Sequence, residues 1–256
     1  MKLLFRTTLA AGLLLTALTT AHAQAVPNGG YETWAARDGV DSPTGWLTID
    51  DIFAADPFGQ VLFPNPTGTF TKVTDVHGGT FALRLETKTI ATLFGPAAVP
   101  GAVSLGNKVN SNSDLGGGLP FTSRPAMLQF YYKLSGPQAS ATGNTALARV
   151  ELTHTVNGEA ETIATAQLTL TTVTSTYVLA QAPLTYTSAA VPDSVHIVFG
   201  TADPDSDDDA TVGTVLQIDD ISFMGTATAT RDAKLAAAIS VWPNPSPDGR
   251  YVLGAT

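Results

Sequence analysis

The sequence predicts an all-β fold, a jelly-roll β-sandwich of about eight or nine antiparallel strands. Of the 256 residues 44% are hydrophobic and only 14% are charged, and Thr, Ala, Val and Gly dominate the composition. Such a composition favours strands and turns over long helices. Apolar and polar residues alternate in several stretches, as in half-buried strands, and turn residues separate these stretches at the spacing typical of sandwiches. We expect no helix after the first 23 residues.

Residues 1–23 predict a secretory signal peptide. Lys2 and Arg6 form a basic start, an apolar run follows that is too short to span a bilayer, and Ala21-His22-Ala23 fits a small-x-small cleavage site. The mature chain is then expected to open at Gln24 and to be secreted or held at the cell surface. No later segment reaches the roughly 18 apolar residues of a membrane span, so no transmembrane segment is expected.

The expected strands follow one another along the mature chain. They are residues 46–49, 81–86, 128–134, 148–152, 162–170, 177–184, 194–199 and 215–223. Between two of them, Asn157-Gly158 is a strong hairpin signal. Residues 96–118 are rich in Gly, Pro, Asn and Ser and predict a long loop. In the third strand Tyr132 falls in the apolar phase and Tyr131 in the polar phase, so we expect only Tyr132 in the core.

The last strand changes phase at two aspartates. Leu216 and Ile218 share one face of the expected strand, whereas Ile221 shares the other, so the phase changes at Asp219-Asp220. A one-residue bulge would produce this change. Two carboxylates inside an apolar strand are costly unless something positive meets them, and the chain has only 13 Lys and Arg residues. A bound cation is therefore one candidate partner.

Charge and residue types exclude several functions. The formal net charge is -9, so the chain offers no basic patch to phosphates and nucleic acid is not an expected partner. The absence of cysteine removes disulfides, thiolate nucleophiles and Cys-ligated zinc. His77, His154 and His196 have no GxSxG or HExxH motif near them, so we do not expect an enzyme. Paired carboxylates of a glycosidase remain open, because their spacing is spatial.

Three motifs resemble a known family. NGGYETW near the start, RPAMLQFYYKL in the middle and VGTVLQIDDISF near the end resemble the family called "putative carbohydrate metabolism domain". More loosely, they are similar to carbohydrate-binding modules with a galactose-binding-like jelly roll. The resemblance covers roughly Pro27 to Met224 and implies one jelly-roll domain over residues 24–225.

The resemblance also implies a structural calcium site. In similar modules a Glu after the opening Asn-Gly pair and an Asp in the last strand hold Ca²⁺ together with backbone carbonyls. By position these are Glu32 and Asp219, with Asp220 as the second choice and with carbonyls from Asn28 and Thr80. Calcium takes six to eight oxygen ligands, which suits this mixture. The alternative is that Glu32 is solvated and Asp219 caps backbone N–H groups at a bulge.

A second acidic stretch partly matches a calcium-binding EF-hand loop, but the match fails at two positions. Asp203, Asp205 and Asp207 match the first ligand positions of an EF-hand loop. However, Asp208 stands where the loop needs Gly, and Thr214 stands where it needs Glu. A solvated acidic loop explains the run better.

The candidate ligand-binding residues are polar or aromatic side chains in the polar phase of their strands. A sugar needs an aromatic platform with planar hydrogen-bonding groups beside it, and Tyr131 with Lys133 and Arg149 supplies these. Trp46 is a further candidate, with burial in the core as its alternative. The expected function is a non-catalytic, carbohydrate-binding module. A structural or adhesive surface protein without a sugar pocket and a glycan-active hydrolase are the alternatives.

After the domain, the composition shifts. Residues 226–239 are small and polar and predict a linker, and residues 240–256 predict a strand, a Pro-rich turn and another strand. The segment VWPNPSPDGRYVL resembles the start of the C-terminal sorting domain of type IX secretion cargo in Bacteroidetes-type bacteria. The resemblance implies the type IX secretion machinery as a partner, and it implies that this sorting domain is incomplete here.

Overall fold

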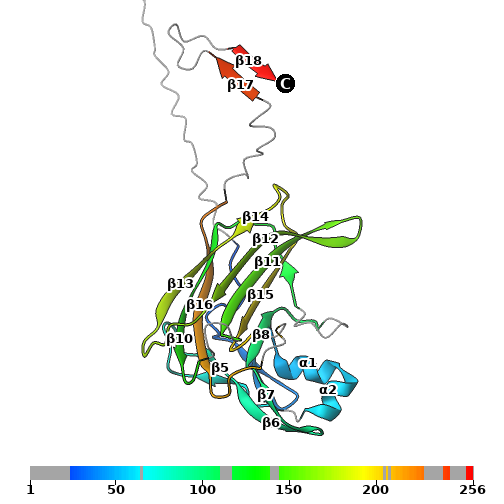
Figure 1. The fold of residues 1–256 in the computed structure, drawn as a ribbon, viewed down its shortest axis with the longest axis vertical. Helices are drawn as coiled ribbons and strands as arrows, with labels where there is room; N and C mark the ends of the chain where they lie inside the picture. Colours follow the sequence, from blue (N-terminus) through cyan, green and yellow to red (C-terminus); the bar gives the residue numbers. More distant parts are fainter. Residues whose placement is uncertain are drawn as a thin grey trace, which may run out of the picture.

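The protein is a sandwich of two large antiparallel sheets (Figure 1). The computed structural model describes residues 24–63, 66–109, 117–138, 144–203, 206, 209–227, 239–242 and 252–255. Strands make up 49% of the chain and helices 7%, so the all-β fold predicted from the sequence is confirmed.

One sheet has five strands and the other has seven. The five-stranded sheet has the order β13 (Val178–Pro183), β10 (Met127–Ser135), β16 (Val215–Met224), β5 (Ala82–Glu86) and β4 (Phe70–Val73). The seven-stranded sheet has the order β14 (Thr185–Tyr186), β12 (Glu159–Thr169), β11 (Leu147–Val156), β15 (Ser194–Gly200), β8 (Ala102–Leu105) and β3 (Trp46–Thr48), with β9 (Leu119–Pro120) paired to β15. The strand total exceeds the expected eight or nine because short edge strands carry too few residues to show an alternation.

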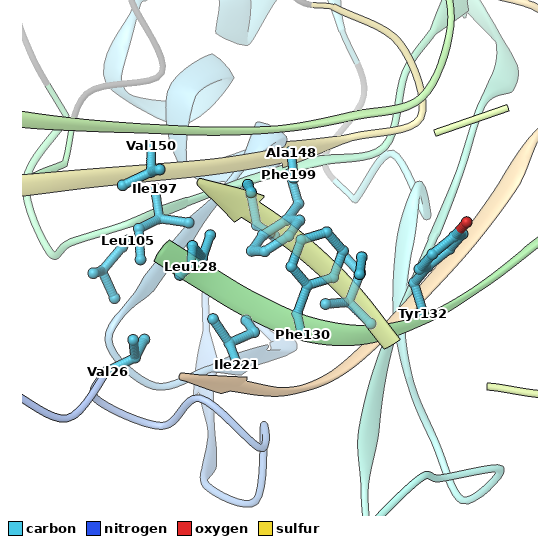
Figure 2. Close-up of a cluster of buried hydrophobic side chains, with 14 of the residues drawn as sticks. Val26, Leu105, Leu128, Phe130, Tyr132, Ala148, Val150, Ile197, Phe199 and Ile221 are labelled. Carbon is cyan, nitrogen blue, oxygen red and sulfur yellow. The ribbon is translucent and has the colours of Figure 1, made fainter. Parts of the chain in front are cut away.

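The main core lies between these two sheets. Phe130 of β10 meets Phe199 of β15 edge to face, with ring centroids 4.9 Å apart, and Figure 2 shows the two rings among Leu128, Val150 and Ile197. Leu128 and Phe130 alternate with outward-facing residues, as a strand's period of two requires. The alternation seen in the sequence therefore places the faces of β10 correctly.

The bulge predicted in the last strand is confirmed. On β10, Gln129 pairs with Ser222 and Tyr131 pairs with Asp219, so two residues of β16 lie opposite Phe130 alone. Asp220, one of the two, has φ of 49°. Asp219 shares the outer face of the sheet with its partner Tyr131, and the loop of His77 and Gly78 covers it, so that it is fully buried.

Two short helices follow β3, although the sequence predicted none. They are α1 (Ile49–Ala55) and α2 (Pro57–Leu62). Thr48 caps α1 through a capping box with Asp51, and Asp56 caps α2, which begins with a proline. The expected strand 46–49 therefore ends at Thr48. These caps are readable signals, but each helix is too short to show a 3.6-residue period.

The expected long loop over residues 96–118 is also wrong in part. It contains most of β7 (Gly95–Val99), which pairs with β6 (Lys88–Thr92), and all of β8. A second apolar cluster forms where Ile52 of α1 meets Ile90 of β6 and Val198 of β15. This cluster fastens α1 and the β6–β7 hairpin to the seven-stranded sheet.

Two further hairpin-like pairs complete the described strands. Near the start, β1 (Trp34–Arg37) pairs with β2 (Val40–Pro43). Near the end, β17 (Ile239–Trp242) pairs with β18 (Val252–Ala255) in an antiparallel two-stranded sheet. The two strands expected around the Pro-rich turn are thus present.

Several predictions fall outside the described residues. These are the signal peptide, nearly all of the linker, the Pro-rich turn itself and most of the acidic run after Asp203. Among the residues that are described, no helix is long and apolar enough to cross a membrane.

Candidate functional site

An aromatic patch lies on the outer face of the five-stranded sheet. It consists of His77, Tyr131, Lys133 and Tyr177. The His77 and Tyr131 rings are stacked with centroids 3.4 Å apart and planes 11° apart, and Tyr177 meets the His77 ring edge-on at 6.1 Å. The Lys133 ammonium lies 5.2 Å from the centroid of Tyr177. Tyr131 and Lys133 come from β10, and His77 comes from the loop that precedes β5.

Asp75 ties the polar side of this patch together. Its carboxylate forms an ion pair with the Lys133 ammonium, and its carbonyl accepts a hydrogen bond of 2.8 Å from the Tyr177 hydroxyl. Burial raises the pKa of Tyr177 well above its ordinary value, and the negative charges of Asp219, Asp75 and Asp220 raise it further. The phenol therefore stays neutral and acts as a hydrogen-bond donor.

A carboxylate clasp, made of Glu32, Asp219 and Asp220, holds the loop that carries His77. Asp219 Oδ2 accepts the backbone N–H groups of His77 and Gly78, at 2.8 Å and 3.1 Å. Glu32 Oε1 accepts those of Thr80 and Phe81, at 2.8 Å and 3.2 Å. Asp220 Oδ2 lies 2.6 Å from Nδ1 of His77. One end of the loop is thus held from the last strand and the other from the N-terminal segment.

The two ends of the domain meet at this clasp. The carbonyl of Gly29 accepts a hydrogen bond of 2.9 Å from the N–H of Ile221, immediately after the bulge. Burial raises the pKa of Asp219, and its hydrogen bonds from Gly78 and His77 oppose that rise. The N–H groups thereby compensate part of the cost of burying this carboxylate.

The glycines of the loop leave room for these carboxylates. A Cβ atom on Gly78 would lie 2.6 Å from Asp220 Oδ2, and one on Gly79 would collide with the Glu32 carboxylate. Gly79 also has φ of 66°, which L-residues with side chains rarely adopt. The His-Gly-Gly sequence of this turn is explained by both constraints.

The negative charge of the clasp suits a calcium ion, but only some of its oxygen atoms are free to act as ligands. Three carboxylates from distant parts of the chain gather here, which suits a hard cation. However, backbone N–H groups already occupy one oxygen of Glu32 and both oxygens of Asp219, as the alternative interpretation of Asp219 expected. Within the described residues, no group of three or more His, Asp and Glu side chains is arranged to hold a metal ion. Calcium at this clasp stays a prediction.

Of the remaining two predicted calcium ligands, Asn28 has other partners. The side-chain amide of Asn28 donates hydrogen bonds to the backbone carbonyls of Thr33 and Thr44, both at 2.9 Å. The backbone carbonyl of Asn28 accepts a hydrogen bond from the N–H of Tyr31 at 3.0 Å. Asn28 therefore fixes the opening turn. Thr80 donates its N–H group to Glu32, and this hydrogen bond does not involve the Thr80 carbonyl, which stays a predicted ligand.

The predicted ligand-binding residues are not all together. Tyr131 and Lys133 lie side by side in the aromatic patch, as expected. Arg149 lies on β11 of the other sheet, where Nη1 is 3.8 Å from Asp203, so it does not stand beside Tyr131. Trp46 is 0% exposed and packs against Tyr31 and Phe199. The prediction of Trp46 as a ligand-binding residue is wrong, because its ring fills the core.

Sequence reasoning missed three residues that complete the patch. Asp75 and His77 lie in a loop before β5, and Tyr177 lies just before β13. No periodicity marks Asp75 and His77, because they are loop residues, and only the His-Gly-Gly turn signalled that the chain folds back here. Tyr177 opened the expected strand 177–184, but nothing in the sequence placed it beside Tyr131.

The fold is similar to two solved structures of Bacteroides proteins, each described as a "putative glycoside hydrolase". The Bacteroides thetaiotaomicron protein superposes with a TM-score of 0.59 and 16% identity, over 78% of this chain and 71% of its own. For the Bacteroides vulgatus protein the TM-score is 0.53 and the identity 16%, over 80% of this chain and 95% of its own. No family model and no curated protein sequence matches the chain. At this identity the similarity shows the fold alone.

Proposed function

We propose that the protein is a secreted or cell-surface, non-catalytic module that binds carbohydrate through the aromatic patch. The observation that carries this proposal is the grouping of three aromatic rings with a lysine and a carboxylate on an outer sheet face. Sugar rings stack their C–H faces on aromatic rings while their hydroxyls bond to polar groups alongside. Next to the patch, Gln129 of β10 pairs across the sheet with the exposed Gln181 of β13, which adds two amides.

The names of the two similar structures support a carbohydrate-related role for this β-sandwich. The same names favour a glycan-active hydrolase as the second candidate. Release of reducing ends from a panel of polysaccharides by the purified protein would establish that candidate. Binding without product release is what we expect of a non-catalytic module.

His77→Ala is expected to weaken glycan binding about tenfold, because the ring that stacks on Tyr131 is lost. Binding to immobilised glycans and calorimetry with the best glycan measure the effect. The matched control is Gln167→Ala, an exposed residue of β12 on the other sheet. Equal affinities for wild type and His77→Ala would remove the patch as the binding site.

Export is proposed from the sequence patterns at the two ends of the chain. Protein recovered outside the cell should begin at Gln24 when its N-terminus is sequenced. A reporter fused to a complete sorting domain that contains residues 240–256 should cross the outer membrane of a host that has type IX secretion. A fusion that stays in the periplasm would contradict type IX sorting, and an exported chain with Met1 intact would contradict the signal peptide.

A further inference from the structure

A hollow lies away from the aromatic patch, beside the two helices. It has a volume of about 320 Å³ and is lined by Asp38, Phe53, Ala54, Gln60 and Phe63. Asp38 lies in the turn between β1 and β2. Phe53 and Ala54 belong to α1. Gln60 belongs to α2, and Phe63 caps the C-terminal end of α2. The hollow is thus built by three elements that are adjacent only in the folded chain.

The apolar wall of the hollow is a fixed pair of rings. Phe53 and Phe63 are stacked with centroids 3.9 Å apart and planes 7° apart. Both rings pack against the second apolar cluster, which includes Ile52 and Ile90. Both rings are half-buried and each covers one face of the other, so the stack presents the outer face of one ring as a preformed flat surface.

The polar groups of the hollow include two acceptors, on Asp38 and Gln60. Among the described residues, the Asp38 carboxylate has neither a hydrogen bond nor an ion pair. The neighbouring Arg37 does not neutralise it, because its guanidinium is engaged by Asp51 at 3.0 Å and by the carbonyl of Trp46 at 2.7 Å. Gln60 donates one N–H of its side-chain amide to the carbonyl of Ala54, which leaves its carbonyl oxygen as a further acceptor and its second N–H as a donor.

We propose that this hollow binds a single pyranose ring that is neutral or carries an amine, and that it rejects uronic acids. The flat phenylalanine pair suits the C–H face of a sugar, and the two acceptors suit its hydroxyl or ammonium donors. A volume of about 320 Å³ is at the small end of ligand pockets, which are about 300–1,000 Å³, and so favours one ring over a longer chain.

Asp38 sets the selectivity of the site. An ionised carboxylate strengthens hydrogen bonds from a sugar hydroxyl or ammonium, and it repels the carboxylate of a uronic acid. The inference rests on the proposed function for the class of ligand. Its location is independent, because none of the residues of the hollow belongs to the aromatic patch.

The test is a titration of isotope-labelled full-length protein, followed by ¹⁵N–¹H NMR, with methyl glucoside, glucosamine and glucuronic acid. We expect saturable shifts of the Gln60 side-chain amide and the α1–α2 backbone with the first two sugars only. Asp38→Asn should weaken glucosamine binding about tenfold, the loss expected for one charge-assisted hydrogen bond, and should admit glucuronic acid. Gln60→Ala should weaken the binding of both methyl glucoside and glucosamine. Phe58→Ala, at a 60% exposed residue of the same helix outside the hollow, should change nothing.

Three results would overturn the inference. These are no saturable shift in α1–α2 with any of the sugars, equal binding of glucuronic acid by wild type, and affinities that Asp38→Asn leaves unchanged. Shifts confined to His77, Tyr131 and Tyr177 would refute this second site while supporting the proposed function. Shifts confined to α1–α2 would support this site and refute the aromatic patch as the binding site.

Discussion

Tyr132→Ala is expected to lower the free energy of unfolding by about 3–5 kcal/mol, the loss typical of a buried aromatic residue. Tyr132 is 7% exposed and packs in the core, with its ring centroid 6.1 Å from that of Phe130 (Figure 2). Truncation removes its apolar contacts and leaves a cavity between the sheets that the neighbours refill only in part. Urea unfolding followed by fluorescence measures the difference.

Tyr131→Ala, one residue earlier on the same strand, is the matched control. Its ring lies outside the core, where it loses mainly the stack on His77, worth about 1 kcal/mol. We expect this variant to lose glycan binding while keeping most of its stability, and Tyr132→Ala to bind glycan wherever it remains folded. A larger loss of stability in Tyr131→Ala than in Tyr132→Ala would mean that the faces of β10 are reversed.

The sequence could predict the faces of β10 because the side chains of a regular strand alternate between its two faces. The same rule identified the bulge in β16, since a change of phase between Ile218 and Ile221 requires an extra residue. What alternation does not contain is the order of strands in the two sheets. Arg149 and Tyr131 both lie in polar phases, yet they belong to different sheets, and only long-range pairing decides this.

The misplaced residues have local causes. Trp46 lies near loops in the sequence, but its large ring fills a space in the core, where it packs against Tyr31 and Phe199. The helices α1 and α2 are held by caps and by the second apolar cluster, which tertiary packing creates. The hollow between Phe53 and Asp38 depends on those helices, so no sequence pattern indicated it.

Asp219→Ala is expected to destabilise the protein by several kcal/mol, because three backbone N–H groups lose their acceptor. They belong to His77, Gly78 and Asp220. These donors are partly buried, so each one left without a partner costs about 1 kcal/mol, the low end of the range for buried donors, and the effects are not additive. The released loop also carries His77 away from Tyr131, so glycan binding should fall as well. Thermal unfolding and glycan calorimetry measure the two losses.

Calcium bound at the clasp would increase the stability of the protein, because the ion binds the folded state and not the unfolded chain. At a concentration about 100-fold above the dissociation constant the added stability is ~2.7 kcal/mol, which raises the melting temperature by several degrees in a domain of this size. We expect wild type to melt higher in excess Ca²⁺ than in EDTA. Glu32→Gln and Asp219→Asn each keep an oxygen that accepts N–H groups but lose a negative charge, so both should lose the calcium response.

These conservative variants separate a metal clasp from a hydrogen-bonded one. If wild type melts identically in EDTA and in Ca²⁺ while Asp219→Ala is still strongly destabilised, then the N–H groups of the loop alone satisfy the buried carboxylate. If a double Asp205→Ala, Asp207→Ala variant loses the calcium response and Asp219→Asn keeps it, the ion binds at the acidic run instead. Only a response that both Glu32→Gln and Asp219→Asn abolish requires an ion between the first and last segments of the domain, where the carbonyl of Gly29 already meets the N–H of Ile221.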